Sequence, residues 1–238
     1  MTLARLETGL ASNGLQLLGQ LNANHGVFLP DLLPGKPAAA LVLVGHVGSS
    51  LWPIFSASSE YLDGRPDSLD RWSRRIGDSL ALESGGRALY PFDGPPFHPF
   101  QGWAKRARAL HQSPLGILID SEFGLWHAWR FALALPDVLA PGPRHEAESP
   151  CVDCSAKPCV SACPADATRE SGFAHEDCIR HLQSASGESC RADGCLSRAA
   201  CPVAQHLRYV PEHGRFHMLA FVSGLSRFNL ETAVSRSP

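Results

Sequence analysis

The amino-acid sequence predicts an α+β protein with two domains, an α/β domain over residues 1–142 and a small cysteine-rich domain over residues 143–238. Three observations support this division. All eight cysteines lie beyond residue 150, short apolar runs alternate with helical patterns before it, and a proline-rich stretch over residues 136–150 separates the two parts. A chain of 238 residues that is 44% hydrophobic can bury one large core and a small second module.

Charge and hydropathy exclude several classes of partner. A formal net charge of -2 offers no basic footprint for a nucleic-acid backbone, so we do not expect a nucleic-acid partner. No stretch approaches the roughly 18 consecutive apolar residues that span a bilayer, and the first residues lack the apolar run of a signal peptide. We therefore expect a cytoplasmic protein without a membrane partner, in which the thiols stay reduced.

The first part of the chain shows one helix pattern and one strand pattern. Leucines recur at helical spacing over residues 3–10, and Asn13-Gly14 offers a left-handed stop, which predicts a short helix. Residues 38–44 are continuously apolar. Such a short run is typical of a central strand that is covered on both faces.

A longer helix is predicted from Asp67, with the side chain of Asp67 as its cap. Apolar residues at helical spacing would form its buried face: Leu69, Trp72, Ile76 and Leu80. Three arginines point elsewhere, and their ordinary role is that of a solvated face: Arg71, Arg74 and Arg75.

The remainder of the first domain predicts a basic helix and two strands. The helix covers residues 101–111. The apolar runs 115–119 and 125–135 are separated by the polar turn 120–122, which predicts an antiparallel hairpin within a mixed sheet.

The cysteines carry the most specific pattern in the sequence. Two, four and three residues separate the first four, which are Cys151, Cys154, Cys159 and Cys163. The other four are Cys178, Cys190, Cys195 and Cys201. Both sets end in Cys-Pro, and bacterial ferredoxins use spacings of two, two and three with the same Cys-Pro ending. Eight thiolates match two [4Fe-4S] clusters, so the sequence predicts a ferredoxin-like module that moves electrons.

The crossover of ligands in bacterial ferredoxins divides the cysteines between the two clusters. Cys201 would join Cys151, Cys154 and Cys159, which leaves Cys163, Cys178, Cys190 and Cys195 for the other cluster. Two structural zinc sites are an alternative, because zinc sites with four cysteines also often begin with Cys-x-x-Cys. The two Cys-Pro endings favour iron–sulfur clusters over zinc, and over free or disulfide-bonded cysteines.

Part of the first domain resembles a known family. The segment Phe123–Arg130, with the sequence FGLWHAWR, is followed by an apolar strand that ends at Pro136. It resembles the signature of CblC-type cobalamin-processing proteins. The apolar run that ends at residue 44 and the helix over 67–82 occur in the same order as in that family, so the resemblance spans about residues 30–136.

The whole chain is also similar in organisation to epoxyqueuosine reductase, which places a hairpin strand and a linker before a doubled ferredoxin module. The segment Asp177–Arg180 resembles a helix of that family that carries an isolated cysteine. Both families, and reductive dehalogenases, build the first domain on a nitroreductase-like α/β fold that binds a corrinoid. The resemblance implies the same fold here, with cobalamin beside an iron–sulfur relay.

The resemblance also implies roles for single residues. Arg130 matches the arginine that helps CblC proteins receive glutathione near the upper face of cobalt. Phe123, Gly124 and Trp126 belong to the same signature, so these four residues are the candidates for cofactor binding. Asp93 falls near the acid that donates a proton in epoxyqueuosine reductase, which makes it the candidate catalytic residue.

The residues by themselves leave other roles open. Arg130 could be a strand arginine that pairs with Glu122 or Asp120. Asp93 could simply form a turn before Gly94, which is a common role of aspartate.

The combined prediction is an iron–sulfur oxidoreductase that takes electrons from an external donor. Its two clusters would pass electrons to cobalamin, for cobalt reduction, upper-ligand removal or corrinoid-dependent reduction of a small-molecule substrate. One alternative is an electron-transfer protein whose first domain binds a flavin or a protein partner, and another is a non-enzymatic cobalamin chaperone. Epoxyqueuosine reductases commonly continue into a helical repeat domain that helps to hold tRNA. The sequence after the last cysteine offers only residues 205–238, so a tRNA substrate is not expected.

Overall fold

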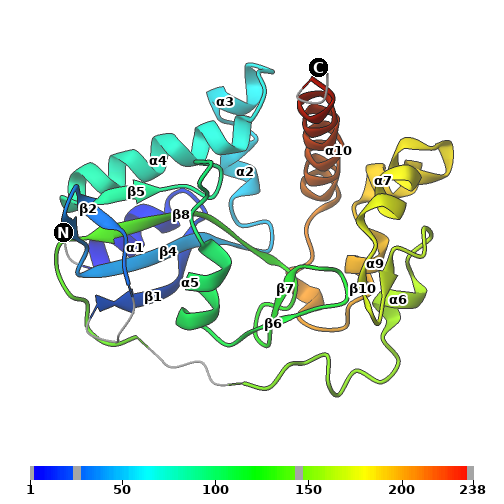
Figure 1. The fold of residues 1–238 in the computed structure, drawn as a ribbon, viewed down its shortest axis with the longest axis horizontal. Coiled ribbons are helices and arrows are strands. Elements are labelled where there is room, and N and C mark those ends of the chain that lie inside the picture. The colour runs from blue at the N-terminus through cyan, green and yellow to red at the C-terminus, as the bar shows by residue number, and fades with distance from the viewer. Residues whose placement is uncertain (1–2, 24–27, 143–146, 235–238) are drawn as a thin grey trace. The chain divides into compact units, whose positions relative to one another are not determined.

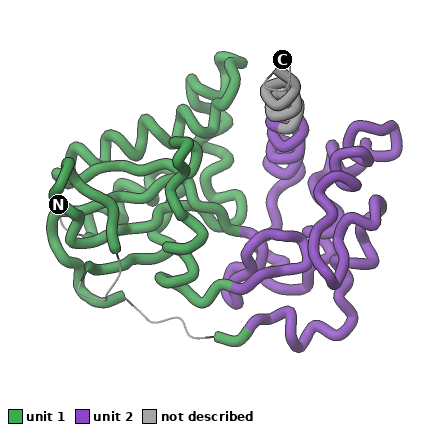
Figure 2. Tube along the Cα trace, in the orientation of Figure 1, with its two compact units in different colours: residues 1–110, 127–148 green, residues 111–126, 149–238 purple. Residues whose placement is uncertain are grey.

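The computed structural model describes residues 3–23, 28–142 and 147–234, with side chains up to residue 224 (Figure 1). The chain forms two compact units (Figure 2). Unit 1 consists of Met1–Leu110 and His127–Glu148, and unit 2 consists of His111–Trp126 and Ser149–Pro238. These units differ from the expected domains 1–142 and 143–238 mainly in residues 111–126. This segment belongs to unit 2, together with the cysteines.

Unit 1 has an antiparallel sheet of four strands in the order β1-β4-β8-β5 (Figure 1). The expected α+β class is therefore confirmed, whereas the expected mixed sheet is wrong, because each of these strands runs antiparallel to its neighbours. The strands of unit 1 are β1 (Gln16–Asn22), β2 (Asp31–Leu33), β3 (Lys36–Pro37), β4 (Ala40–Val47), β5 (Arg87–Leu89) and β8 (His127–Leu135). Its helices are α1 (Leu3–Ala11), α2 (Trp52–Phe55), α3 (Ser59–Leu62), α4 (Ser68–Ser84) and α5 (Phe100–Ala107).

The predicted first helix and central strand are both present. Helix α1 ends before Gly14, whose φ of +64° is the left-handed conformation that the Asn13-Gly14 pair predicted. Strand β4 lies between β1 and β8, and its residues 40–44 are completely buried. A strand with neighbours on both edges and covered faces has no polar surface to present, which explains its continuous apolar run.

Helix α4 confirms the predicted buried face and the predicted start after Asp67, but not the capping role of the Asp67 side chain. The four apolar side chains predicted for that face are buried: Leu69, Trp72, Ile76 and Leu80. Asp67 precedes the helix in the left-handed conformation, with φ of +56°, and its side chain makes no capping hydrogen bond. A capping side chain needs an extended backbone at that position, so the predicted capping role is wrong.

The arginines of α4 form ion pairs and not simply a solvated face. Arg71 lies 2.7 Å from Asp63, Arg74 pairs with Asp93, and Arg75 pairs with Glu60. Glu60 on α3 is the most buried of the three carboxylates, with 11% of its side chain exposed. The ion pairs therefore attach α3 and the loop after β5 to the outer side of α4.

The Glu60–Arg75 pair predicts an acid-dependent contribution to stability. The hydrogen bond from Arg75 lowers the pKa of Glu60 from 4.5 to about 2. A carboxylate whose folded pKa is depressed stabilises the fold above its unfolded pKa, and this stabilisation is lost as the pH falls from about 4.5 to about 2. Because Arg75 is more than half exposed, we expect Glu60→Gln to cost about 2 kcal/mol at neutral pH.

The measurement is thermal unfolding of both proteins between about pH 7 and about pH 3. The difference between them should shrink as the solution becomes acidic. Glu83→Gln is the matched control, because Glu83 lies 3.8 Å from its partner Arg5 and both are largely exposed. A Glu60→Gln difference that stays constant over this range would contradict the assignment.

The predicted hairpin between residues 115–119 and 125–135 is not formed. Strand β7 (Leu118–Asp120) pairs with β6 (Leu110–Gln112), whereas β8 pairs with β4 and β5 in the sheet of unit 1. Between β7 and β8, the carboxylate of Asp120 accepts hydrogen bonds from the backbone N–H groups of Glu122 and Phe123, at 2.7 and 3.0 Å. This local turn ends β7 and separates the two runs. The helix predicted over residues 101–111 is observed as the shorter α5 (Phe100–Ala107). The last residues of the predicted range belong to strand β6 instead.

Unit 2 consists mainly of short elements, followed by one long helix. In addition to β6 and β7 it contains α6 (Pro158–Ser161), β9 (Thr168–Arg169), β10 (Gly172–Phe173), α7 (His175–Gln183), η2 (Ala185–Gly187), α8 (Glu188–Asp193), α9 (Leu196–Ala199), η3 (Gln205–Leu207) and α10 (Pro211–Val234). Helix α10 packs against α7 and α8. Among the described residues, no helix combines the length and the apolar character that crossing a membrane requires.

Candidate metal centres

The eight cysteines are free thiols, and unit 2 brings them together in two groups of four. The first thiol group consists of Cys151, Cys154, Cys159 and Cys201. The second thiol group consists of Cys163, Cys178, Cys190 and Cys195. This grouping has the same members as the partition expected from ferredoxin crossover. Each group therefore takes one cysteine from the opposite half of the motif.

The second thiol group surrounds a small cavity, which we name the thiol cavity. Cys163 follows α6, Cys178 lies on α7, Cys190 lies on α8, and Cys195 directly precedes α9. Most of the other walls are apolar, including Phe173, Leu182, Leu196 and Met218. Four sulfur donors that converge within apolar walls suit a thiolate-bound metal centre better than a water site.

Burial and mutual proximity raise the pKa of three thiols of this group, Cys178, Cys190 and Cys195. Burial, together with the thiols of Cys195, Cys163 and Cys190, raises the pKa of Cys178 to about 12. Several thiolates in one buried space repel each other, so they ionise together only when a metal supplies positive charge. The second thiol group is therefore chemically suited to a cationic centre.

Cys163 differs from its neighbours because backbone N–H groups point at its sulfur. Burial acts to raise the pKa of Cys163, but hydrogen bonds from the N–H groups of Ala167, Thr168 and Ala165 outweigh it, so that the pKa is lowered. The nitrogen of Ala167 lies 3.3 Å from the Sγ atom of Cys163. N–H···S hydrogen bonds of this kind stabilise a thiolate and tune the potential of a cluster that it holds.

The first thiol group lies against an apolar core. Burial, followed by the thiols of Cys201, Cys151 and Cys154, raises the pKa of Cys159. The core that contains Cys159 and Cys201 also contains three side chains from the segment 111–126: Leu115, Ile119 and Leu125. This segment, which the expected boundary placed in the first domain, therefore forms a wall of the first thiol group.

Helix α9 connects the two thiol groups, because Cys195 precedes it and Cys201 follows it closely. The hydroxyl of Ser197 on this helix is buried, donates a hydrogen bond to the carbonyl oxygen of Cys159, and lies 2.8 Å from the hydroxyl of Thr168. These contacts fix α9 between the segments that carry the other cysteines. Ser197 therefore links α9 directly to a cysteine of the first thiol group.

Arg198 fixes the other side of α9. Its guanidinium donates hydrogen bonds to the carbonyl oxygen of Leu125, with Nε at 3.1 Å. It lies over the rings of Trp126 and Tyr209, at 4.8 and 4.4 Å from their centroids. Cation–π contacts on both rings hold the helix against residues 125–126.

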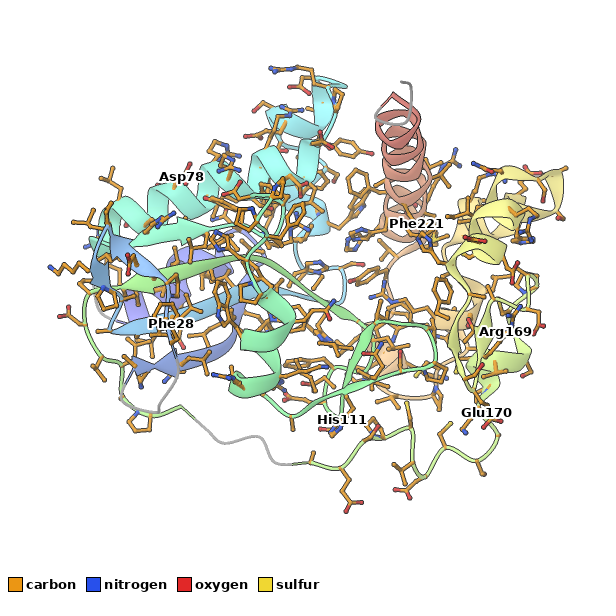
Figure 3. The ribbon with its side chains drawn as sticks, in the orientation of Figure 1. Phe28, Asp78, His111, Arg169, Glu170 and Phe221 are labelled. Carbon is orange, nitrogen blue, oxygen red and sulfur yellow. The ribbon has the colours of Figure 1, made fainter. Side chains whose placement is uncertain are left out.

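Surface ion pairs link the segments that carry the cysteines. Arg169 of β9 lies 2.7 Å from Asp177 of α7. Glu170 lies 2.6 Å from Lys157, which precedes α6. Figure 3 labels Arg169 and Glu170 at the same edge of unit 2. The pairs connect the loop of the first four cysteines to the helix that carries Cys178.

The residues expected to bind a corrinoid are divided between the two units. Phe123, Gly124 and Trp126 lie in unit 2, and Arg130 lies on β8 in unit 1. Gly124 has a φ of +58°, and a Cβ atom there would lie 2.6 Å from the carbonyl oxygen of Val203. Gly124 therefore permits close packing on the chain just after Cys201. Its place in the signature has a structural explanation in unit 2.

Arg130 has a partner that the sequence did not indicate. Its guanidinium lies 2.5 Å from Asp70 and donates a hydrogen bond of 3.0 Å to Ser73, and both partners are on α4. The alternative of a structural strand arginine named Glu122 or Asp120 as the partner, and the structure gives Arg130 an ion pair with Asp70. A glutathione-binding role for Arg130 stays a prediction.

Asp93 lies in the turn that follows β5. Its N–H donates to the carbonyl oxygen of Tyr90 at 3.2 Å, and its carboxylate pairs with Arg74. The guanidinium of Arg74 also lies over the rings of Tyr90 and Phe92, at 4.3 and 5.1 Å. Asp93 is thus a turn residue engaged in an ion pair, and its role as a proton donor stays a prediction.

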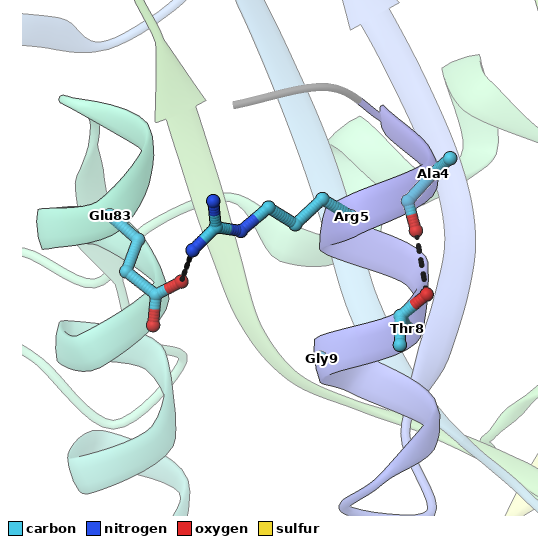
Figure 4. A pocket seen from close by; sticks show the side chains of 5 residues that line it. All are labelled: Ala4, Arg5, Thr8, Gly9 and Glu83. Atoms are coloured by element: carbon cyan, nitrogen blue, oxygen red, sulfur yellow. Dashed lines mark hydrogen bonds and ion pairs between the residues drawn. The ribbon is translucent and has the colours of Figure 1, made fainter.

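A surface cavity of unit 1 lies between α1 and α4 (Figure 4). It is lined by Ala4, Arg5, Thr8, Gly9 and Glu83. The ion pair of Arg5 and Glu83 crosses it, and Thr8 donates to the backbone of its own helix at 3.0 Å. An open depression with charged walls does not fit the broad apolar faces of a corrinoid.

Comparison with known proteins gives distant structural similarity. No protein-family model matches the sequence, and no curated protein matches it. Epoxyqueuosine reductase from Bacillus subtilis has 15% sequence identity and a TM-score of 0.43, with 89% of this chain and 69% of that chain covered. The enzyme from Streptococcus thermophilus has 13% identity and a TM-score of 0.40, with 86% and 67% covered. A third structure, of epoxyqueuosine reductase with a tRNA-Tyr epoxyqueuosine-modified stem loop, has 16% identity and a TM-score of 0.41, with 90% and 71% covered.

Sequence reasoning missed the residues that support the thiol groups. Ser197, Arg198 and Thr168 contact segments that are 29 to 73 positions away in the chain. Only their position between cysteines could have drawn attention to them. The assignment of the candidate centres rests on the cysteines and on the geometry of unit 2.

Proposed function

We propose that this protein is an iron–sulfur oxidoreductase that holds two [4Fe-4S] clusters and delivers electrons to a corrinoid. The observation that carries the proposal is the convergence of eight free thiols into two groups of four in one unit. When bound, such clusters supply one-electron transfer at low potential.

The arrangement of the ligands favours iron–sulfur clusters over zinc. Cys201 joins the group formed by the early cysteines, and Cys163 joins the group formed by the later ones. This interleaving is typical of two-cluster ferredoxins, whereas structural zinc sites commonly use ligands from neighbouring pairs. The N–H groups that point at Cys163 and the apolar walls of the thiol cavity would hold the sulfur ligands and exclude water.

The corrinoid is proposed as the electron acceptor on the basis of the signature Phe123–Arg130. The surface cavity between α1 and α4 does not fit a corrinoid, so this half of the proposal rests on the sequence resemblance. Asp93 is proposed as the proton donor on a separate resemblance, because it falls near the acid that donates a proton in epoxyqueuosine reductase. Release of its carboxylate from Arg74 would be required first.

The iron–sulfur half is tested by anaerobic purification followed by elemental analysis. We expect about eight iron atoms and about eight acid-labile sulfides per chain, and an electron paramagnetic resonance signal after reduction. Zinc in place of iron, or a colourless protein without labile sulfide, would contradict this half.

The corrinoid half is tested with hydroxocobalamin and the cluster-loaded protein. We expect binding heat and a change in the cobalamin spectrum on reduction, and the same protein stripped of iron should bind without reducing cobalt. Absence of binding, or flavin released on denaturation, would instead favour an electron-transfer protein with another acceptor. Binding without reduction by the loaded protein would favour a chaperone.

A further inference from the structure

His181 lines the thiol cavity and carries a buried polar atom that makes no hydrogen bond to the described residues. It lies on α7 three residues after Cys178, so the two side chains project from the same face of the helix. The Nε2 atom of His181 is buried and has no hydrogen-bond partner among the described residues. A buried polar atom without a partner is unfavourable, which makes such an atom informative about what the cavity holds.

The side chains around His181 offer few hydrogen-bond acceptors for its Nε2 atom. The two hydroxyl side chains of the cavity, Thr168 and Ser197, lie 2.8 Å apart, and Ser197 is also bonded to the backbone of Cys159. The side chains of the neighbouring apolar walls, such as Phe173, Leu182 and Met218, have no acceptor oxygen. The sulfur atoms that this cavity would contain are therefore the natural acceptors for an N–H group at Nε2.

We propose that His181 donates an N–H···S hydrogen bond from Nε2 to a sulfur atom of the second cluster and thereby raises its reduction potential. The inference rests on the proposed function, because it requires a cluster in the thiol cavity. A hydrogen bond to sulfur withdraws electron density and stabilises the more negative, reduced cluster. His181 is thus a positioning and tuning residue, and it acts together with the N–H groups at Cys163.

The experiment measures both cluster potentials in the full-length, cluster-loaded protein by redox titration with electron paramagnetic resonance detection. His181→Leu removes the donor and retains the apolar bulk, whereas His181→Gln retains an N–H donor. The matched control is His175→Leu. His175 lies on the same helix but is exposed, and its ring contacts Phe173 and Phe221 at 6.4 and 5.5 Å between centroids.

We expect His181→Leu to shift one of the two potentials to a more negative value. His181→Gln should restore part of this shift, and His175→Leu should leave both potentials unchanged. If His181→Leu binds full iron with both potentials at the wild-type values, the inference fails while the proposed function stands. If the wild-type protein binds no iron, the proposed function fails by itself.

Pulsed electron paramagnetic resonance keeps the inference testable if His181→Leu fails to assemble the second cluster. In protein with nitrogen-labelled histidine, a hydrogen bond to sulfur gives a weak nitrogen coupling to the reduced cluster. This coupling should disappear in His181→Gln. A strong coupling, typical of a direct iron–nitrogen bond, would overturn the hydrogen bond in favour of ligation. No coupling at all would also overturn it.

Discussion

Replacing Cys178 with alanine is expected to remove one cluster and to leave the other, so that bound iron falls from about eight to about four atoms per chain. Cys178 lies among Cys195, Cys163 and Cys190, and burial together with these thiols raises its pKa to about 12. Alanine supplies no ligand, and the thiol cavity contains no spare cysteine. Iron and sulfide analysis of the anaerobically purified variant gives the result directly.

Double variants test the crossover of ligands between the two groups. Cys163→Ala combined with Cys178→Ala should still bind about four iron atoms, because both residues belong to the second thiol group. Cys159→Ala combined with Cys178→Ala should bind none, because one ligand is missing from each group. If the Cys163 and Cys178 pair instead loses all iron, the clusters follow the two halves of the sequence and the crossover is wrong.

The cysteines could be assigned from sequence because their chemistry is local in the chain. Four cysteines within residues 151–163, with a Cys-Pro ending, already restrict the possible ligand set. The walls of the sites could not be assigned in this way. Leu115 and Leu125 are far from the cysteines in sequence but share a core with Cys159, and Arg198 bonds to a carbonyl 73 positions away.

The fold shows the same contrast between local and long-range information. Strand β4 and helix α4 were predicted because their burial follows directly from apolar runs and helical spacing. The hairpin was wrong because two neighbouring apolar runs pair with strands elsewhere, and hydrogen bonds to the carboxylate of Asp120 turn the chain between them. The ion pair between Arg130 and Asp70 could not be predicted either, because it depends on how α4 packs on β8.

Gly45→Ala is expected to have the largest effect on the stability of unit 1. Gly45 lies on β4 opposite Trp129 of β8, where the register of the two strands shifts. A Cβ atom at this position would lie 2.1 Å from the carbonyl oxygen of Ala128 and 2.6 Å from the side chain of Leu18. Both strands are held by neighbours in the sheet, so the carbonyl cannot move away without loss of pairing. We expect a loss of about 3 kcal/mol and a fall in Tm of about 10 °C.

Gly102→Ala provides a control in which the same substitution has the opposite sign. Gly102 lies exposed on α5, where the nearest atom to an added Cβ is the Cβ of Pro99 at 3.9 Å. Alanine removes backbone freedom from the unfolded chain there, so stability should rise by about 0.5–1 kcal/mol. Thermal unfolding of both variants therefore compares a steric clash with an entropic gain for the same glycine-to-alanine substitution.

Because Gly45 lies in unit 1, the Gly45→Ala protein should still bind full iron below its Tm. An unchanged Tm for Gly45→Ala would mean that β4 and β8 do not approach each other closely at this shift in register.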